Sequence, residues 1–267
     1  MDKYTVVGNP IAHSKSPLIH AMFAEQTQQA IHYDKQLAPL EGFACWLQGF
    51  VADKGKGLNV TVPFKEQAYA LCDQLTAEAK AAQAVNTILI RDGQCVGHNT
   101  DGLGLVADLI SQGVVLSGSR VLLLGAGGAA KGAALPILDA GVAELVIANR
   151  TYHKAEAIAA MHQGRAIVAK PLAELSGNFD VIINSTSASL QGQSIDLPDE
   201  LVSRETTAYD MMYSDGATPF NQWAHKRGAK QCIDGLGMLV HQAALAFEFW
   251  RGVAPDAQAV MKRLRLG

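Results

Sequence analysis

The chain has 267 residues, a formal net charge of −3 at pH 7 and 49% hydrophobic residues, which fits one large or two medium domains. No broad basic field is available to hold a polyanion, so we expect no nucleic-acid partner and no membrane partner. No run of 18 apolar residues occurs, and the short apolar run before Gly8 is typical of a first strand rather than of a signal peptide. Any phosphate or carboxylate ligand must therefore be held by a few local groups.

The spacing of cysteine and histidine argues against a metal or redox centre. Cys45, Cys72, Cys95 and Cys232 form no metal-like or redox-motif pair, and none of the eight histidines falls in a zinc-ligand spacing. We expect four reduced, mostly buried thiols, which is typical of a cytoplasmic protein.

Strand and helix patterns alternate along the first hundred residues, which favours an α/β architecture. A helix is predicted to open at Ser16-Pro17, with Ser16 as its N-cap and proline at the first helical position. The other predicted elements are strands at 3–8, 31–38 and 57–64, helices at 40–51 and 75–84, and a hairpin at 86–100 with Asp92-Gly93 at its turn.

The pattern changes after residue 101. Continuous apolar strands, of which 120–124 is the first, are typical of a parallel sheet covered on both faces. The predicted elements are strands at 120–124, 144–149, 166–170, 180–185 and 207–212, and helices at 128–141, 151–162 and 218–228. We therefore predict a doubly wound, Rossmann-type domain at 102–237, and a first α/β domain at 1–101 to which the C-terminal helices at 238–267 return.

A glycine-rich turn follows the strand at 120–124. Gly125, Gly127 and Ala130 match the pattern G-x-G-x-x-[GA], directly after a strand and at the start of a helix. Glycine permits the tight turn and lets the backbone approach a pyrophosphate at the helix N-terminus. The alternative is a helix of small residues that only packs on a sheet. The strand–turn–helix context favours the dinucleotide site.

The end of the next strand carries a cation where an NAD-binding protein carries an acid. A carboxylate there would accept a hydrogen bond from the ribose 2′-hydroxyl, whereas this chain offers Asn149 and Arg150. An arginine fork suits a 2′-phosphate, Thr151 adds a hydroxyl at a helix N-terminus, and Lys154 adds a second positive charge. The pattern predicts NADP, and the alternative is a capping threonine beside two solvated cations.

A polar strand end leads into a lysine at the start of a helix. Asn59 and Thr61 share one face of their strand, and Lys65 begins the next helix. A helix N-terminus disfavours a protonated lysine, which suits a group that gives and takes protons, whereas a nearby Asp101 would orient the amine and favour its charged form. An ordinary surface lysine and a purely capping Asp101 are the alternatives left open.

Two hydroxyls precede the first helix. Ser14 and Ser16 are one residue apart, and two hydroxyls at a helix N-terminus make a neutral anion site that suits a carboxylate. Plain capping by Ser16 explains the pattern equally well.

A series of short motifs resembles one enzyme family. The motifs are "GNPIAHSKSP", "NVTVPFK", "AVNT", "GHNTDG", "GAGGAA", "ANRT", "NSTSASL", "YDMMY" and "DGLGMLVHQAA", which run from Gly8 to about Ala244. In this order they resemble the shikimate dehydrogenases, and most closely the NADP-dependent biosynthetic members. The resemblance implies an N-terminal substrate-binding domain and a Rossmann-type NADP-binding domain. It also implies the reversible NADPH-dependent reduction of 3-dehydroshikimate to shikimate, in chorismate and aromatic amino acid biosynthesis.

The resemblance also implies residue roles, carried over by motif. Lys65 is the implied acid/base at the reacting oxygen, paired with Asp101. The other implied substrate contacts are Ser14, Ser16, Asn59, Thr61, Asn86, Tyr213 and Gln242. The implied cofactor contacts are Gly125, Ala126, Gly127, Gly128, Ala129 and Ala130 at the pyrophosphate, Asn149, Arg150, Thr151 and Lys154 at the 2′-phosphate, and Ser185, Thr186, Ser187, Met211, Gly235 and Met238 along the cofactor cleft and nicotinamide.

Three other functions stay open at this point. A quinate/shikimate dehydrogenase that uses NAD is the nearest, and Arg150 argues against it. A ligand sensor on the same fold would not need to retain Lys65 and Asp101. A folate-linked methylene dehydrogenase shares the two-domain layout but does not explain "HSKSP" and "NRT" together. The oligomeric state, monomer or homodimer, is open, as is the degree of NADP preference, which Lys154 would weaken because the family commonly has an arginine there.

Overall fold

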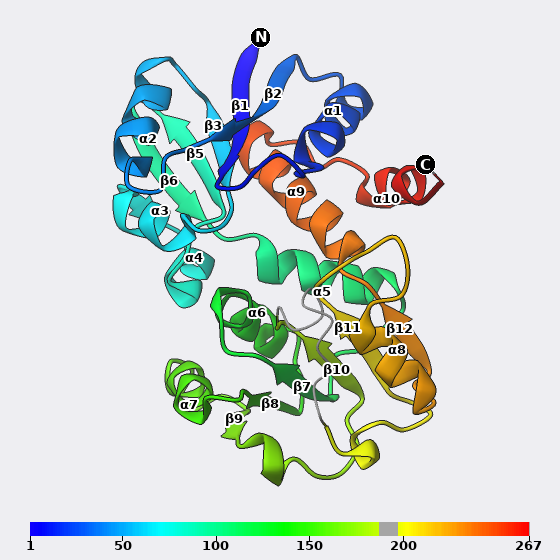
Figure 1. Ribbon diagram of the computed structural model, residues 1–267. Helices are drawn as coiled ribbons and strands as arrows, with labels where there is room; N and C mark the ends of the chain where they lie inside the picture. The colour runs from blue at the N-terminus through cyan, green and yellow to red at the C-terminus, as the bar shows by residue number, and fades with distance from the viewer. Residues whose placement is uncertain (187–196, 267) are drawn as a thin grey trace. The chain divides into compact units, whose positions relative to one another are not determined.

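The computed structural model describes residues 1–186 and 197–266 (Figure 1). The chain forms two compact units, Met1–Gly104 with Val240–Gly267, and Leu105–Leu239. Each unit contains a six-stranded sheet, so the predicted α/β class is confirmed. The chain passes from the first unit to the second within helix α5 (Asp101–Ser111) and back within helix α9 (Leu236–Arg251).

The first unit has a mixed sheet in the order β2-β1-β3-β5-β6-β4. Strand β1 runs parallel to β2 and β3, whereas β5 runs antiparallel to β3 and β6. Besides its parts of α5 and α9, its elements are β1 (Asp2–Gly8), α1 (Ser16–Thr27), β2 (Ile31–Leu37), α2 (Phe43–Ala52), β3 (Gly57–Val60), α3 (Lys65–Leu71), β4 (Gln74–Leu75), α4 (Ala77–Ala82), β5 (Thr87–Arg91), β6 (Gln94–His98) and α10 (Ala257–Leu266).

Local chemistry explains where several of these elements begin and end. Asp92 and Gly93 both have positive φ values, 52° and 79°, which gives the hairpin turn the twist that two paired strands require. The predicted cap of α1 was wrong by one residue. Ser16 is the first helical residue, Lys15 occupies the N-cap, and the backbone N–H of Ser16 donates to Ser14 Oγ at 3.3 Å. Strand β4 has two residues, too few for a sequence period to reveal.

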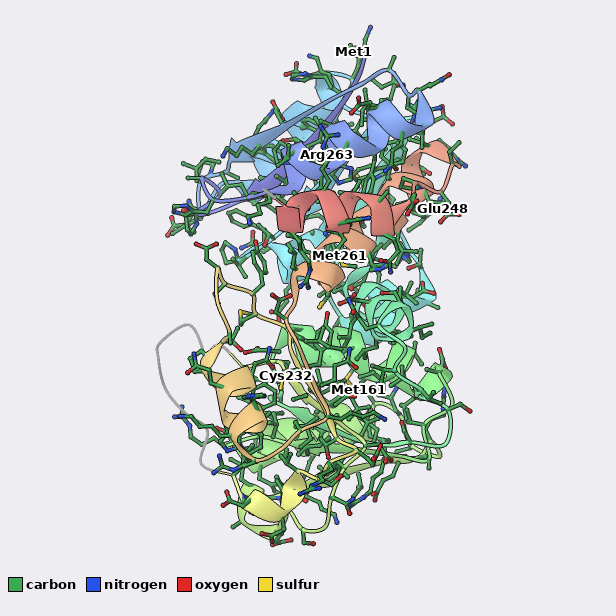
Figure 2. The ribbon with its side chains drawn as sticks, turned by 90° about the vertical axis from the view of Figure 1, so that its right-hand side faces the viewer. Met1, Met161, Cys232, Glu248, Met261 and Arg263 are labelled. Carbon is green, nitrogen blue, oxygen red and sulfur yellow. The ribbon has the colours of Figure 1, made fainter. Side chains whose placement is uncertain are left out.

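The C-terminal helices return to the first unit, as predicted. Helix α10, red in Figure 1, packs against α1 and carries Met261 and Arg263, which are labelled in Figure 2. Arg263 lies 3.4 Å from Glu25 on α1. Arg251, at the end of α9, forms an ion pair of 2.5 Å with Asp2. Inside the unit, the Trp250 ring of α9 lies 4.9 Å from that of Tyr4 on β1. Burial of these aromatic surfaces joins the two ends of the chain in one core.

The second unit is a parallel sheet in the order β12-β11-β10-β7-β8-β9. The order reverses between β7 and β10, and ligands of doubly wound sheets bind at such a switch point. Besides its parts of α5 and α9, its elements are β7 (Arg120–Leu124), α6 (Gly128–Asp139), β8 (Glu144–Ala148), α7 (Tyr152–Ala160), β9 (Ile167–Lys170), η1 (Leu172–Glu174), β10 (Val181–Asn184), η3 (Asp199–Leu201), β11 (Thr207–Asp210), α8 (Pro219–Lys226) and β12 (Gln231–Ile233). The predicted Rossmann-type topology is confirmed, and the three-residue β12 was not predicted.

The described residues contain neither a helix that is long and apolar enough to span a bilayer nor a cluster of His, Cys, Asp and Glu placed to hold a metal. All four cysteines are free. Cys95 is buried and Cys72 and Cys232 are partly buried, but Cys45 is exposed on α2, so the expectation of mostly buried thiols fails at that residue.

Candidate functional site

A lysine–aspartate ion pair lies at the centre of the predicted site residues of the first unit. Lys65 is the first residue of α3 and Asp101 the first residue of α5. Lys65 Nζ donates to Asp101 Oδ2 at 2.6 Å, with the two side chains 30% and 15% exposed. This contact favours a lysine paired with Asp101 over an ordinary solvated surface lysine, which was the alternative left open by the sequence. It also leaves part of the amine open to a reactant.

The second carboxylate oxygen is held by an amide. Asn86 Nδ2 donates to Asp101 Oδ1 at 2.8 Å and to Thr100 Oγ1 at 3.0 Å. Gln242, buried on α9, has its Oε1 3.4 Å from both Asn86 Nδ2 and Thr100 Oγ1. Asp101 therefore has both oxygens engaged, one by a cation and one by a neutral donor, which fixes the plane of its carboxylate.

Asn59 is buried and joins the same set of polar groups. Its Nδ2 donates to the backbone oxygen of Asn86 at 3.2 Å and to Thr87 Oγ1 at 3.0 Å, and its Oδ1 accepts from Tyr33 Oη at 2.7 Å. Tyr33 and Thr87 were not among the predicted site residues. Thr87 follows Asn86 in the "AVNT" motif, a signal that could have identified it, whereas Tyr33 stands in no motif.

The two serines and Thr61 complete the predicted substrate residues of this unit. Ser14 is partly exposed and Ser16 is buried. Burial raises the pKa of Tyr33 well above its usual value, and the Ser16 side chain offsets part of this effect. Thr61 lies just beyond β3, partly exposed, with its backbone N–H bonded to Val7 at 2.9 Å. Tyr213 belongs to the second unit, where burial raises its pKa.

The glycine turn of the second unit joins β7 to α6 at the switch point. Gly125 has φ +107°, and a Cβ there would lie 2.5 Å from Ser185 Oγ, so both conformation and space require glycine. Gly127 is the N-cap of α6 with no side-chain cap, and a Cβ at Gly127 or Gly128 would meet no atom of another part of the described chain within 4 Å. Ala130 is fully buried in the core. Open space before uncapped helical N–H groups fits the approach of a pyrophosphate.

The end of β8 presents the predicted cations to solvent. Arg150 and Lys154 are exposed, and among the described residues neither forms an ion pair. Thr151 occupies the N-cap of α7 but makes no side-chain cap bond, which differs from simple capping. Asn149 Nδ2 donates to the Thr151 carbonyl oxygen at 2.9 Å, which fixes the turn. Two cations and a spare hydroxyl at a helix N-terminus fit a 2′-phosphate.

The remaining predicted cofactor residues follow β10 and β11. Ser185 Oγ donates to the Leu124 oxygen at 2.7 Å, which ties the end of β10 to the glycine turn. A Cβ at Gly235 would lie 2.1 Å from the carbonyl oxygen of Met211, so these two backbones touch. Thr186 lies partly exposed after β10, and Met238 on α9 packs against the core of the unit. Of the two alanines of the glycine turn not yet described, Ala126 is buried and Ala129 is partly buried. Ser187 lies outside the described residues.

Three family models cover most of the chain. Residues 6–88 match the shikimate dehydrogenase substrate binding domain, 107–221 the shikimate / quinate 5-dehydrogenase domain, and 235–265 the shikimate 5′-dehydrogenase C-terminal domain. The chain is 54% identical to a shikimate dehydrogenase (NADP(+)) of Hahella chejuensis over 100% of both chains. It is 55% identical to that of Aeromonas salmonicida over 99% of this chain and 98% of the relative.

The chain belongs to the shikimate dehydrogenase family. A crystal structure of shikimate 5-dehydrogenase from Thermus thermophilus, in complex with NADP(H) and shikimate, superposes with a TM-score of 0.90 at 34% identity, covering 100% of this chain and 99% of that one. The predictions of the family, of an NADP-dependent oxidoreductase activity and of NADP as cofactor are confirmed.

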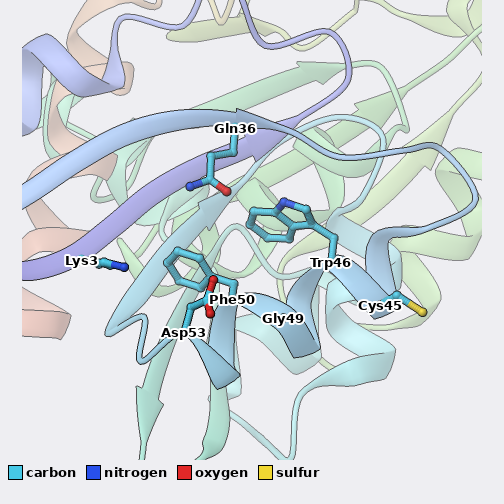
Figure 3. A pocket seen from close by; sticks show the side chains of 7 residues that line it. All are labelled: Lys3, Gln36, Cys45, Trp46, Gly49, Phe50 and Asp53. Carbon is cyan, nitrogen blue, oxygen red and sulfur yellow. The ribbon is translucent and has the colours of Figure 1, made fainter.

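The first unit also contains a cavity that is lined by residues other than the predicted site residues. It has a volume of about 290 Å³ and lies beside α2 in the first unit (Figure 3). Its wall is made by the rings of Trp46 and Phe50, which stack 5.5 Å apart on successive turns. The full lining is Lys3, Gln36, Cys45, Trp46, Gly49, Phe50 and Asp53. None of these is a predicted substrate or cofactor residue.

Proposed function

We propose that this chain catalyses the reversible reduction of 3-dehydroshikimate to shikimate by NADPH. In the proposal the first unit holds the substrate and the second unit holds NADP, with Lys65 and Asp101 as the catalytic pair. The 2.6 Å bond between Lys65 Nζ and Asp101 Oδ2 carries this assignment, because it places a partly exposed proton donor beside a fixed carboxylate.

Bound NADPH supplies the hydride for the ketone carbon. Lys65 acts on the other end of the carbonyl bond. Its ammonium donates a proton to the ketone oxygen as that oxygen gains negative charge, and solvent replaces the proton through the 30% exposed face of the side chain. In the reverse direction the neutral amine accepts the hydroxyl proton. Asp101 keeps Nζ in place and balances its charge while the ammonium is present.

The substrate of this reaction is a small ring with one carboxylate and several hydroxyls, which suits short polar side chains. We assign the carboxylate to the hydroxyls of Ser14 and Ser16. We assign the ring hydroxyls to Thr61, Asn86, Asp101, Tyr213 and Gln242, with Asn59 supporting them. The hydroxyl of Thr61 makes no hydrogen bond within the described part of the chain, which supports its use toward a ligand.

NADP is held by backbone N–H groups at its pyrophosphate and by cationic side chains at its 2′-phosphate. The glycine turn from Gly125 to Ala130 holds the pyrophosphate with uncapped N–H groups. Asn149, Arg150, Thr151 and Lys154 hold the 2′-phosphate. Ser185, Thr186, Met211, Gly235 and Met238 line the path toward the nicotinamide.

A four-way assay at 340 nm tests the function. Purified protein receives shikimate with NADP, shikimate with NAD, and quinate with each. We expect fast reduction of NADP with shikimate and slow reduction in the other three mixtures. Comparable rates with NAD or quinate would instead assign the chain to the broader-specificity branch. No reduction in any mixture would overturn the catalytic proposal in favour of a ligand sensor.

We also propose that the protein works in the cytoplasm. All four cysteines are free, and burial raises the pKa of Cys72 to about 12, so that this thiol stays protonated and unreactive. Fractionation of cells that express the tagged full chain tests this, and recovery in a membrane or extracellular fraction would contradict it.

A further inference from the structure

A line of hydrogen bonds runs through the first unit from a tyrosine on β2 to the catalytic lysine. Tyr33 Oη donates to Asn59 Oδ1 at 2.7 Å, and Asn59 Nδ2 donates to Thr87 Oγ1 at 3.0 Å. Thr87 Oγ1 donates to Asn86 Oδ1 at 2.9 Å. Asn86 Nδ2 donates to Asp101 Oδ1, whose other oxygen accepts from the lysine. Asn59, Asn86 and Thr87 are all buried.

Every bond in this line has one allowed direction. The backbone oxygen of Asn86 can only accept, so its bond from Asn59 Nδ2 fixes the Asn59 amide and makes Tyr33 Oη the donor to Asn59 Oδ1. Asn59 must then present its oxygen to the tyrosine and its amide hydrogens to Thr87. Having accepted that hydrogen bond, the Thr87 hydroxyl is left to donate its own proton to Asn86 Oδ1. The Tyr33 phenol and the Thr87 hydroxyl therefore support the same orientation of the Asn86 amide that the backbone N–H of Thr100 and the Asp101 carboxylate require.

The orientation of the Asn86 side-chain amide matters because its oxygen and its nitrogen have different partners. Its oxygen also accepts from the backbone N–H of Thr100 at 2.9 Å, while its nitrogen faces the carboxylate of Asp101. A reversed amide would place its NH₂ against the Thr100 N–H and its oxygen against a carboxylate. Thr87 opposes that reversal directly, and the tyrosine opposes it through Asn59.

The tyrosine is itself held by aromatic packing. The ring of His20 stacks on that of Tyr33 at 4.1 Å with 14° between the planes, and Trp250 lies 6.2 Å away. Burial lowers the pKa of His20 to about 3, so it stays uncharged at working pH. Trp250 Nε1 is fixed in turn to the Ile88 oxygen at 2.9 Å. The line thus begins at a group that packing keeps in one orientation.

We propose that Tyr33 and Thr87 are positioning residues of the reaction, which fix the amides of Asn59 and Asn86 and through them the carboxylate that holds Lys65. The inference rests on the proposed function, because it needs Lys65 to be the proton donor. Neither residue touches the reacting oxygen. Their effect reaches the substrate through the placement of Asp101 and Asn86.

Thr87→Val tests the line with almost no change in shape. We expect kcat/KM for shikimate to fall about five- to tenfold, the rate equivalent of one net hydrogen bond, with the KM for NADP unchanged. Thr87→Ser restores the hydroxyl and is expected to stay within about twofold of the parent protein. Thr5→Val is the matched control. Thr5 is fully buried in the same sheet, and among the described residues its hydroxyl donates to the backbone oxygens of Val6 and Asp34 alone.

The two valine variants separate positioning from folding. Both lose a buried hydroxyl, so we expect both to lower the melting temperature, but only Thr87→Val to lower kcat/KM. Equal kcat/KM in both variants would overturn the proposal, as would failure of Thr87→Ser to recover activity.

Tyr33→Phe removes the first hydrogen bond of the same line, from the Tyr33 hydroxyl to Asn59. We expect a fall in kcat/KM of about two- to fivefold, smaller than for Thr87→Val because Asn86 keeps its direct bond from the threonine. The double variant Tyr33→Phe/Thr87→Val is expected to fall little further than Thr87→Val, because groups in one network are not additive. Fully additive losses would argue for two unrelated structural defects.

Lys65→Ala, measured beside these variants, distinguishes the two proposals. If Lys65→Ala is inactive and Thr87→Val has normal kcat/KM, the catalytic role of Lys65 and Asp101 stands and the positioning role of Tyr33 and Thr87 is wrong. A nearly normal Lys65→Ala removes the catalytic assignment, and the positioning role falls with it.

Discussion

The two units offer their ligands different kinds of polar group. In the first unit the candidate site is built from side chains that already bond to one another, such as Asn59 to Thr87 and Asn86 to Asp101. In the second unit the groups offered are the backbone N–H groups of a glycine turn and exposed cations such as Arg150. The first arrangement fixes directions before a ligand arrives, whereas the second supplies charge and space.

The difference follows from what each ligand requires. A ring with several hydroxyls is recognised by the direction of each hydrogen bond, and a proton must reach one particular oxygen. A phosphate accepts hydrogen bonds from many directions and is attracted by any nearby cation. Substitutions in the first unit should therefore act mainly on turnover with shikimate. Those in the second should act mainly on the affinity for NADP.

Lys65→Ala is expected to have the largest effect. It removes the proposed proton donor, so kcat should fall about 10²- to 10⁴-fold, the usual contribution of a positioned acid/base. The affinity for NADP, measured by fluorescence titration, should stay unchanged because the cofactor groups belong to the other unit. Lys80→Ala, an exposed lysine on α4 of the same unit, is the control and should retain full activity. Turnover close to normal in Lys65→Ala would rule out its acid/base role.

Arg150→Gln should have the next largest effect, confined to NADP. Loss of a charge-assisted, forked contact to a phosphate should raise the KM for NADP about 10- to 100-fold. The KM for NAD, which has no 2′-phosphate, should change little, so the preference between the two cofactors narrows. Lys154→Ala removes a point charge without a fork and should raise the KM for NADP by a few-fold only. An equal rise for both cofactors in Arg150→Gln would show that this arginine does not read the 2′-phosphate.

Local sequence patterns predicted where candidate residues stand along helices and turns, but not which of them come into contact. The position of Lys65 at the start of a helix follows from local pattern, as does the glycine turn after β7. The approach of Lys65 to Asp101 joins residues 36 positions apart and depends on how two helices leave the sheet. No local period carries that information.

Tyr33 shows why part of this hydrogen-bonded network was not predicted from the sequence. Strand β1 separates β2 from β3, with Tyr33 opposite Tyr4 and Asn59 opposite Val6. Because Tyr4 and Val6 are two residues apart on β1, their partners project from the same face of the sheet. The register that brings Tyr33 to Asn59 is a property of three strands together. A sequence read one strand at a time cannot supply it.

Two glycines of the same turn provide the smallest and most discriminating prediction. Gly127 has φ −88° and ψ −170°, which any residue adopts, and a Cβ there would meet no atom of the rest of the described structure within 4 Å. Gly127→Ala should therefore leave the melting temperature unchanged. If the pyrophosphate approaches this backbone, the added methyl group should raise the KM for NADP about fivefold.

Gly125→Ala is the comparison, because there the protein itself requires glycine. The φ of +107° and the Ser185 Oγ atom 2.5 Å from a Cβ should cost about 1–3 kcal/mol of unfolding free energy, measured by denaturant titration. A stable Gly127→Ala with an unchanged KM for NADP would contradict close approach of the pyrophosphate. The added methyl group would then meet neither the protein nor the cofactor. A stable Gly127→Ala with a raised KM would assign the turn's two glycines to different tasks, Gly125 to the fold and Gly127 to the cofactor.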